Sequence, residues 1–294
     1  MEGLDVGKVA VVRVGGGLGE SLDRGLELIG GLDLKGGEVV IKPNICNSKN
    51  PYGMVLTDIG LITEVISRLK PLARRVTVVE SDNIDGPAEK RIRDSGLMER
   101  LEKLDVEFIN LTREDDFEVH KVAGAEIQIP RKVLEADYFV NIPKIKTCGP
   151  TLVTLSIKNL FGLIPTPKKS RLHGLLDEVL PYLAKIIRHS LIVVDGIMAM
   201  EGNGPVIGTP RPLGLIVLGR NPVEVDSVIT SLMGFNPDDV NHIARAHRMG
   251  VGEMSLEKIE VLGDAWKGIR PFERPYTLKA SIKCLKSIGK LYLP

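Results

Sequence analysis

Cysteine is scarce in this chain and is poorly placed for a metal cluster. The 294 residues include three cysteines, Cys46, Cys148 and Cys284, which lie far apart in the sequence. They form no C-x-x-C pair and no Cys/His spacing typical of zinc or ferredoxin sites. We therefore expect free thiols, no intrinsic iron–sulfur cluster and a cytoplasmic location.

The chain also has little net charge and few aromatic residues. Lysine and arginine together number 39 against 38 acidic residues, and Phe, Trp and Tyr make up 4% of the chain. A net charge of +1 provides no general field that would attract nucleic acid. The basic stretch Lys168–Arg171 lacks the interleaved aromatic side chains of a base-stacking surface. Nucleic acid is therefore not an expected partner.

Long apolar runs are absent as well. No run approaches the roughly 20 residues of a membrane span. The first residues, MEGLDVGKVAVV, lack the basic start and apolar core of a signal peptide. We expect no membrane partner, and a 43% apolar composition is enough for a substantial core.

Runs rich in Val and Ile alternate with stretches of helical periodicity. This alternation predicts an α/β fold with a mostly parallel sheet and helices on both faces. The expected strands are Val9–Val14, Glu38–Ile41, Arg75–Glu80, Glu107–Asn110, Tyr138–Ile142, Leu191–Asp195, Leu213–Gly219 and Lys258–Leu262. The expected helices are Glu20–Ile29, Leu61–Leu69, Ala88–Ser95, Gly174–Ile187 and Pro222–Met233.

Two further features complete the predicted architecture. Val119–Val122 and Ala125–Pro130 flank a glycine and predict a hairpin that adds an antiparallel edge to the sheet. After residue 265 the pattern changes to scattered Arg, Pro and Lys. We predict a single domain over residues 1–265 and a peripheral C-terminal arm over residues 266–294, with a closing helix at Leu278–Gly289.

Cations and amides gather where the predicted strands end, which is where open α/β sheets bind ligands. In an extended chain Lys144 and Lys146 would share one face, and helical spacing over Thr151–Leu160 would project Lys158 and Asn159 towards them. The alternative is a solvated basic rim. The predicted ligand-binding residues are Lys42, Asn44, Lys144, Lys146, Thr147, Lys158, Asn159 and Asn203.

Carboxylates follow other strands. Such hard oxygen donors suit a divalent cation, although they would equally pair with the lysines or favour a helix start. The predicted metal ligands are Glu80, Asp195, Glu201 and Asp226. For catalysis we predict Glu201, Asp195 and Lys146, the carboxylates acting as acid and base.

Several short segments together resemble one family, the domain of unknown function 362 family. They are Ile41-Lys-Pro-Asn44, Thr57-Asp58, Val79-Glu-Ser81, Asn141-Ile-Pro-Lys-Ile-Lys-Thr147, Lys158-Asn-Leu-Phe-Gly162, Asp195-Gly196, Glu201-Gly-Asn-Gly-Pro205 and Asn221-Pro-Val-Glu-Val-Asp226. The resemblance runs from about Val9 to Val251. It implies one α/β unit and, in many members, an appended ferredoxin module.

This chain departs from that pattern in two places. It lacks the cysteine-rich segment of the iron–sulfur members, so a redox role would need a separate ferredoxin-like protein. Members often carry His after the Lys-x-Lys-Thr run, where this chain has Cys148. A thiolate beside lysines would itself be reactive or bind metal.

Two functional hypotheses follow from the sequence. The first is an enzyme that binds a small phosphate- or carboxylate-bearing metabolite, with a divalent metal, at the carboxyl edge of the sheet. The alternative is a non-catalytic accessory or cofactor-binding protein that works with a separate iron–sulfur protein.

Overall fold

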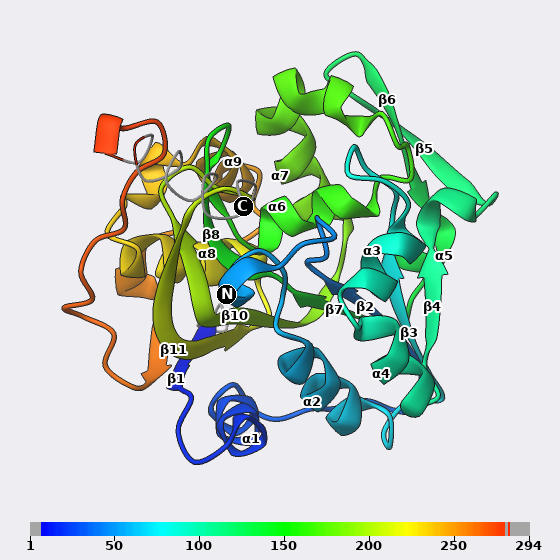
Figure 1. Ribbon diagram of the computed structural model, residues 1–294, viewed down its shortest axis with the longest axis horizontal. Coiled ribbons are helices and arrows are strands. Elements are labelled where there is room, and N and C mark those ends of the chain that lie inside the picture. Colours follow the sequence, from blue (N-terminus) through cyan, green and yellow to red (C-terminus); the bar gives the residue numbers. More distant parts are fainter. Residues whose placement is uncertain (1–6, 280–281, 283–294) are drawn as a thin grey trace, which may run out of the picture.

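A mixed β-sheet forms the centre of the protein (Figure 1). The computed structural model describes residues 7–279 and residue 282. Within them the sheet has the strand order β12-β1-β11-β10-β7-β2-β3-β4, and β8 lies beside β10 and pairs with β9. The strands are β1 (Lys8–Arg13), β2 (Glu38–Pro43), β3 (Arg75–Glu80), β4 (Glu107–Asn110), β7 (Tyr138–Ile142), β8 (Lys144–Cys148), β9 (Leu152–Thr154), β10 (His189–Glu201), β11 (Thr209–Gly219) and β12 (Glu260–Gly263).

Most neighbouring strands in this sheet run parallel. β7, β2, β3 and β4 form a continuous parallel set, and β10 is parallel to both β7 and β8. The antiparallel neighbours are β1 with β11, β10 with β11 and β8 with β9. The predicted α/β class with a mostly parallel sheet is confirmed.

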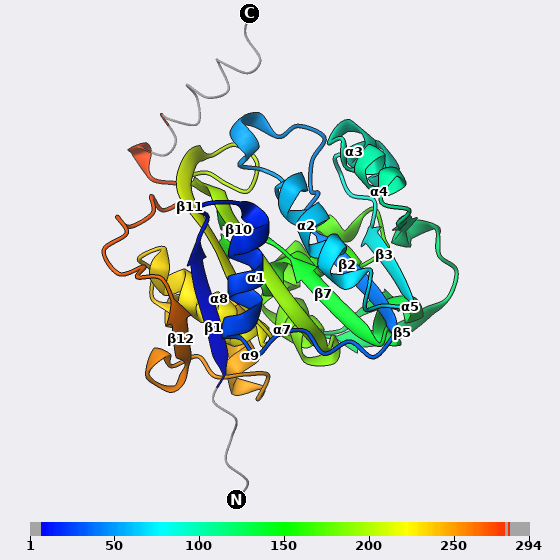
Figure 2. The same cartoon turned by 90° about the horizontal axis from the view of Figure 1, so that it is seen from below.

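Helices cover both faces of the sheet, as the fully apolar strands predict. Alternate residues of one strand enter different cores: Val9 and Val11 pack with α6 to α9, whereas Ala10 and Val12 pack with α1 to α4. Figure 2 shows α1 and α2 lying across the second of these faces. The helices are α1 (Leu18–Leu28), α2 (Ile59–Leu69), α3 (Ala88–Asp94), α4 (Leu97–Lys103), α5 (Arg131–Leu134), α6 (Ser156–Asn159), α7 (Leu176–Ile186), α8 (Pro222–Leu232) and α9 (Asn241–Arg248).

The predicted hairpin is present, but its place in the fold differs from the prediction. β5 (Phe117–Val122) and β6 (Ala125–Pro130) pair as a separate two-stranded sheet and add no edge to the central one. Val122, Ile127 and Ile129 are buried in the core that includes α7. Side-chain burial against helices therefore holds the hairpin, without a strand partner in the main sheet.

The helix predicted over Thr151–Leu160 is wrong. Residues 152–154 form β9, the first residue of which has a positive φ of 62°, and α6 spans only four residues. A helix needs a run of residues with negative φ, so the segment divides there. The helix predicted at Leu278–Gly289 falls largely outside the described residues.

Among the described residues, none of the helices combines the length and the apolar character that crossing a bilayer requires.

Candidate functional site

A pocket of about 220 Å³ lies beyond the ends of β2, β3 and β8. Its walls carry four lysines and two carboxylates: Lys42, Lys146, Lys158, Lys169, Glu80 and Asp85. Asn44, Cys46, Asn83, Thr154, Asn159, Phe161 and Gly162 also line it, as do Ile84, Pro167, Ser170, His173, Pro205 and Val206. Typical drug-sized pockets span about 300–1,000 Å³, so this one suits a small metabolite. We refer to it as the lysine pocket.

The ends of β2 and β3 meet in a buried ion pair. Lys42 Nζ lies 2.8 Å from Glu80 Oε2, and both side chains are at most 5% exposed. Burial lowers the pKa of Lys42, and the Glu80 carboxylate opposes this effect. Gly162 packs directly behind the pair, since a Cβ there would approach Lys42 Cε to 2.7 Å. A side chain at residue 162 would therefore displace the pair.

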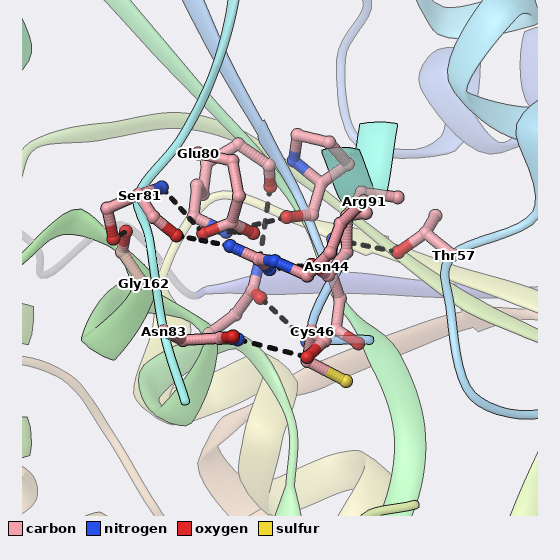
Figure 3. A network of polar contacts seen from close by, with 12 residues as sticks. Asn44, Cys46, Thr57, Glu80, Ser81, Asn83, Arg91 and Gly162 are labelled. Carbon is pink, nitrogen blue, oxygen red and sulfur yellow. Dashed lines mark hydrogen bonds and ion pairs between the residues drawn. The ribbon is translucent and has the colours of Figure 1, made fainter. Parts of the chain in front are cut away.

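Arg91 of α3 ties the two loops at this edge together (Figure 3). Its fully buried guanidinium donates to the carbonyls of Ile45 and Ser81. Asn83 Nδ2 donates to the carbonyl of Cys46 at 3.0 Å. Because donors on one loop satisfy carbonyls on the next, the wall formed by these loops is fixed before any ligand binds.

Lys146 reaches the pocket from β8. Its ammonium donates to Asn44 Oδ1 and to the carbonyl of Val55, both at 2.8 Å, and lies 3.5 Å from Cys46 Sγ. The side chain is fully buried, and none of these three partners is a carboxylate. Lys146 therefore forms no ion pair with Asp or Glu within the described residues.

Three asparagine amides continue from Lys146 into the interior. Asn44 Nδ2 donates to Asn159 Oδ1 at 3.1 Å, and Asn159 Nδ2 donates to Asn141 Oδ1 at 2.8 Å. Asn141 Nδ2 then donates to the carbonyl of Ser156 and lies 3.3 Å from His189 Nε2. These contacts join β2, β7 and α6 behind the pocket and set the orientation of each amide.

Lys158 differs from the other pocket lysines. Within the described part of the chain its ammonium has no hydrogen-bond or ion-pair partner and lies 4.8 Å from the centre of the Phe161 ring. Burial lowers its pKa, with a further contribution from Lys146, whereas Cys148 and Cys46 raise it. This cation is therefore available to a ligand.

Lys169 enters the pocket from a short 3-10 helix, Lys169–Leu175. Its ammonium donates to Ser81 Oγ and, at 3.0 Å, to the carbonyl of Ile164. Burial lowers the pKa of Lys169 to about 7; Glu80 and Asp82 oppose the shift, and Lys42 and Arg91 add to it. Lys169 is thus poised to change charge near neutral pH.

The structure gathers six of the predicted site residues in the lysine pocket: Lys42, Asn44, Glu80, Lys146, Lys158 and Asn159. It places the remaining ones elsewhere. Lys144 and Asp195 form a buried ion pair at 2.7 Å, and Asp195 also accepts from the backbone N–H groups of Asp58 and Ile197. This pair joins β8, β10 and the start of α2, and neither member lines the pocket.

The predicted residues of the Glu201-Gly-Asn-Gly turn contact other segments. Arg270 donates to Glu201 at 2.8 Å, and Asn203 Oδ1 accepts from the backbone of Tyr276, so both bind the predicted C-terminal arm. Thr147 Oγ1 donates to the carbonyl of Gly202 at 2.7 Å. The turn contributes Pro205 and Val206 to the lysine pocket, but not its carboxylate.

Asp226 binds the N-terminal end of α6. Its carboxylate accepts from the backbone N–H groups of Ser156 and Ile157, each at 2.9 Å, and from Ser156 Oγ. Burial raises the pKa of Asp226 to about 7, although these hydrogen bonds oppose the shift. The sequence left open a role for Asp226 near the start of its own helix, α8, whereas the structure places its carboxylate at the start of α6.

The four predicted metal ligands are not brought together. Glu80 pairs with Lys42, Asp195 with Lys144 and Glu201 with Arg270, while Asp226 binds α6. No group of three or more His, Cys, Asp or Glu side chains within the described residues is arranged to hold a metal ion. The predicted shared metal site at the strand ends therefore lacks a donor set here.

Sequence reasoning missed several lining residues. Lys169 and His173, which belong to a basic loop, were not among the predicted site residues. Thr154, Phe161 and Cys46 carried no recognised site signal, although Phe161 lies in a segment that supported the family resemblance. Cys148 is 2% exposed, pairs with Leu152 of β9 and is not among the residues that line the pocket.

The sequence matches the family model described as Domain of unknown function (DUF362) over residues 39–231. The chain belongs to this family. The matched region includes β2, β3, β8 and α6, which supply most of the lysine pocket of this DUF362 protein. The resemblance inferred from the short segments is confirmed.

One curated relative is a thylakoid-associated protein from Synechocystis sp. It is 27% identical over 269 residues, which cover 86% of this chain and 83% of the relative. The association with thylakoids belongs to that protein, and a cytoplasmic location of this DUF362 chain stays a prediction.

Two solved structures share partial similarity. A protein from Thermotoga maritima matches with a TM-score of 0.38 and 12% identity, covering 80% of this chain and 57% of that one. The lactate racemase apoprotein from Thermoanaerobacterium thermosaccharolyticum matches with a TM-score of 0.36 and 13% identity, covering 64% and 50%. This chain thus spans about half the length of both structures, and TM-scores this low support no inference about function.

Proposed function

We propose that this DUF362 protein binds a small phosphate- or carboxylate-bearing metabolite in the lysine pocket. One observation carries the proposal: Lys146, Lys158 and Lys169 line one small pocket, and none of them forms an ion pair within the described part of the chain. Like charges held in a buried site repel one another, and an anion relieves this repulsion. Phosphate and carboxylate oxygens would also form strong charge-assisted hydrogen bonds with ammonium groups.

A buried hydroxyl supports the same proposal. Thr154 lines the pocket and is 5% exposed, and its buried Oγ1 has no hydrogen-bond partner among the described residues. Leaving a buried polar group unsatisfied costs about 1–3 kcal/mol. A ligand oxygen in the pocket would satisfy the hydroxyl and recover this free energy.

Proton transfer is the chemistry that the pocket would offer a bound anion. Lys169, with a pKa of about 7, is suited to act as a general acid or base at neutral pH. This assignment replaces Asp195 and Glu201, the predicted acid and base, because neither of them lines the pocket. The proposed enzyme therefore relies on a lysine where the sequence suggested carboxylates.

Alkylation of Cys46 tests whether anions occupy the pocket. In a Cys284→Ser background, we expect iodoacetamide to label Cys46, which lines the pocket, and to spare Cys148, which is 2% exposed. Saturating sulfate should slow labelling several-fold because Cys46 Sγ lies 3.5 Å from Lys146 Nζ. Mass spectrometry of the labelled peptides measures both rates. A Cys46→Ser variant gives the background, and an unchanged rate at high sulfate would count against the proposal.

The pH dependence of sulfate binding tests the contribution of Lys169. Sulfate keeps its charge between pH 6 and 8.5, whereas Lys169 is protonated below its pKa of about 7 and neutral above it. Affinity should therefore be highest below pH 7 and fall by up to about tenfold per pH unit above it. Calorimetric titration of the wild type and of Lys169→Met measures this slope. A variant that keeps the full slope would show that another group titrates.

A further inference from the structure

We propose that the ligand of the lysine pocket is an amphipathic anion, in which an apolar, preferably aromatic, group is attached to the charged one. This inference rests on the proposed anion-binding function and specifies its substrate class. The pocket has two chemically different ends. The ammonium groups of Lys42 and Lys146 belong to side chains that are at most 1% exposed, so they lie at its inner end.

The outer end carries four apolar side chains. Ile84, Pro167, Pro205 and Val206 line the pocket and are partly or fully exposed, so they lie towards its mouth, beside the exposed polar residues Asp85, Ser170 and His173. They come from three separate segments: the loop after β3, the loop before Lys169 and the turn between β10 and β11. An inorganic anion would be held by the inner end and would leave these side chains in contact with water.

Ile84 is the most exposed of these side chains, at 86%. It stands at the tip of a tight turn in which the backbones of Asn83 and Gly86 bond to each other in both directions. Turn tips usually carry polar residues, Gly or Pro. An isoleucine held there at the mouth of a cationic pocket can cover the apolar part of a bound molecule, and burying it in that way is favourable.

The Phe161 ring points to a flat apolar group. Phe161, which is 7% exposed, also lines the pocket, with Lys158 Nζ 4.8 Å from the centre of its ring and the His173 ring 5.8 Å away at an angle of 33°. Rings at such distances make favourable offset contacts. An aryl phosphate or aryl carboxylate would place its anionic group on the lysines and its ring beside Phe161.

Calorimetry with inorganic phosphate, methyl phosphate and phenyl phosphate tests this inference. We expect phenyl phosphate to bind at least tenfold more tightly than methyl phosphate. Ile84→Asn should reduce this preference several-fold and leave the affinity for inorganic phosphate unchanged. Val119→Asn, which changes a 55% exposed side chain on the hairpin, provides the matched control and should alter neither affinity.

The outcomes separate this inference from the proposed function. If phosphate binds but phenyl phosphate binds no more tightly than methyl phosphate, the proposal of an amphipathic ligand is wrong. The proposal that the pocket binds anions would still hold. If none of the three compounds binds at millimolar concentration, both proposals fail. An aromatic preference that survives Ile84→Asn but is lost in Phe161→Leu would retain the ligand class and place the contact on Phe161 alone.

Discussion

Lys158→Met should weaken sulfate binding about 10- to 100-fold and leave the unfolding temperature nearly unchanged. The ammonium of Lys158 has no hydrogen-bond or ion-pair partner within the described residues, so its removal orphans no protein group. A hydrogen bond to a charged group contributes about 1.5–3 kcal/mol, which corresponds to this loss of affinity. Calorimetry and thermal denaturation in the absence of anion measure the two quantities.

The control for this substitution is Lys121→Met, whose side chain is 82% exposed on the hairpin. It removes the same charge far from any buried ammonium group and should leave sulfate affinity within about twofold. Equal losses of sulfate affinity in the two variants would show that Lys158 acts only through the net charge of the protein. Lys146→Met is a less suitable test because it also leaves Asn44 Oδ1 and the Val55 carbonyl without their donor.

Lys144→Met should have the opposite profile, with a large loss of stability and little effect on sulfate binding by the folded protein. It leaves the Asp195 carboxylate, which is fully buried, without its cation. Breaking such a pair on one side costs about 3–5 kcal/mol of unfolding free energy. Urea denaturation at pH 7 measures the loss. Weakened sulfate binding at unchanged stability would instead return Lys144 to the ligand-binding role that the sequence predicted.

The loss should also depend on pH. Burial raises the pKa of Asp195 above that of the unfolded chain, and removing Lys144 takes away a group that opposes this shift. With a folded pKa above the unfolded one, the variant binds more protons when folded, so its stability falls as pH rises from about 4. Denaturation at pH 5 should thus show a smaller difference from wild type than at pH 8. A Lys144→Met/Asp195→Asn double variant should recover part of the loss.

The predicted strands β3, β4 and β7 have the same bounds in the structure. β3 and β4 begin and end with polar residues, and β7 lies between Asp137 and Pro143, so each end is marked in the sequence. The helix predicted over residues 151–160 was wrong because a few residues at helical spacing are also compatible with a strand. The conformation of Leu152 depends on its pairing with Cys148 in the β8–β9 hairpin. β8 was not among the predicted strands, although Lys144 and Lys146 were placed on extended chain. It pairs locally with β9, as a hairpin, and non-locally with β10.

The candidate site was predictable to the extent that it lies at strand ends. Lys42, Glu80 and Lys146 each follow or belong to an apolar strand, and parallel strands bring such ends to one edge. The sequence did not predict which group each carboxylate would contact. Asp195 binds Lys144 and Glu201 binds Arg270, and a linear sequence does not distinguish a carboxylate that meets a lysine from one that meets a metal.

The burial of Lys169 could likewise not be predicted from the sequence. The stretch Lys168–Arg171 has the composition of a solvated loop, yet its two lysines differ: Lys168 is exposed, whereas Lys169 is 6% exposed beneath it. Only the folded chain shows which of two adjacent lysines enters the pocket. Consequently the group proposed for proton transfer was found by geometry alone.

The hydrogen bonds of the asparagine chain behind the pocket allow only one orientation of each amide group. An ammonium group cannot accept a hydrogen bond, so Lys146 forces Asn44 to present its oxygen, and each amide then dictates the orientation of the next as far as Asn141. Asn141 donates to His189 Nε2, so the histidine proton must lie on Nδ1, facing the Ile187 carbonyl. The carbonyls of Lys42 and Ser156, which accept from Asn159 and Asn141, require the same amide orientations. The amide chain that contacts Lys146 at one end therefore fixes the tautomer of a buried histidine on a different strand at the other.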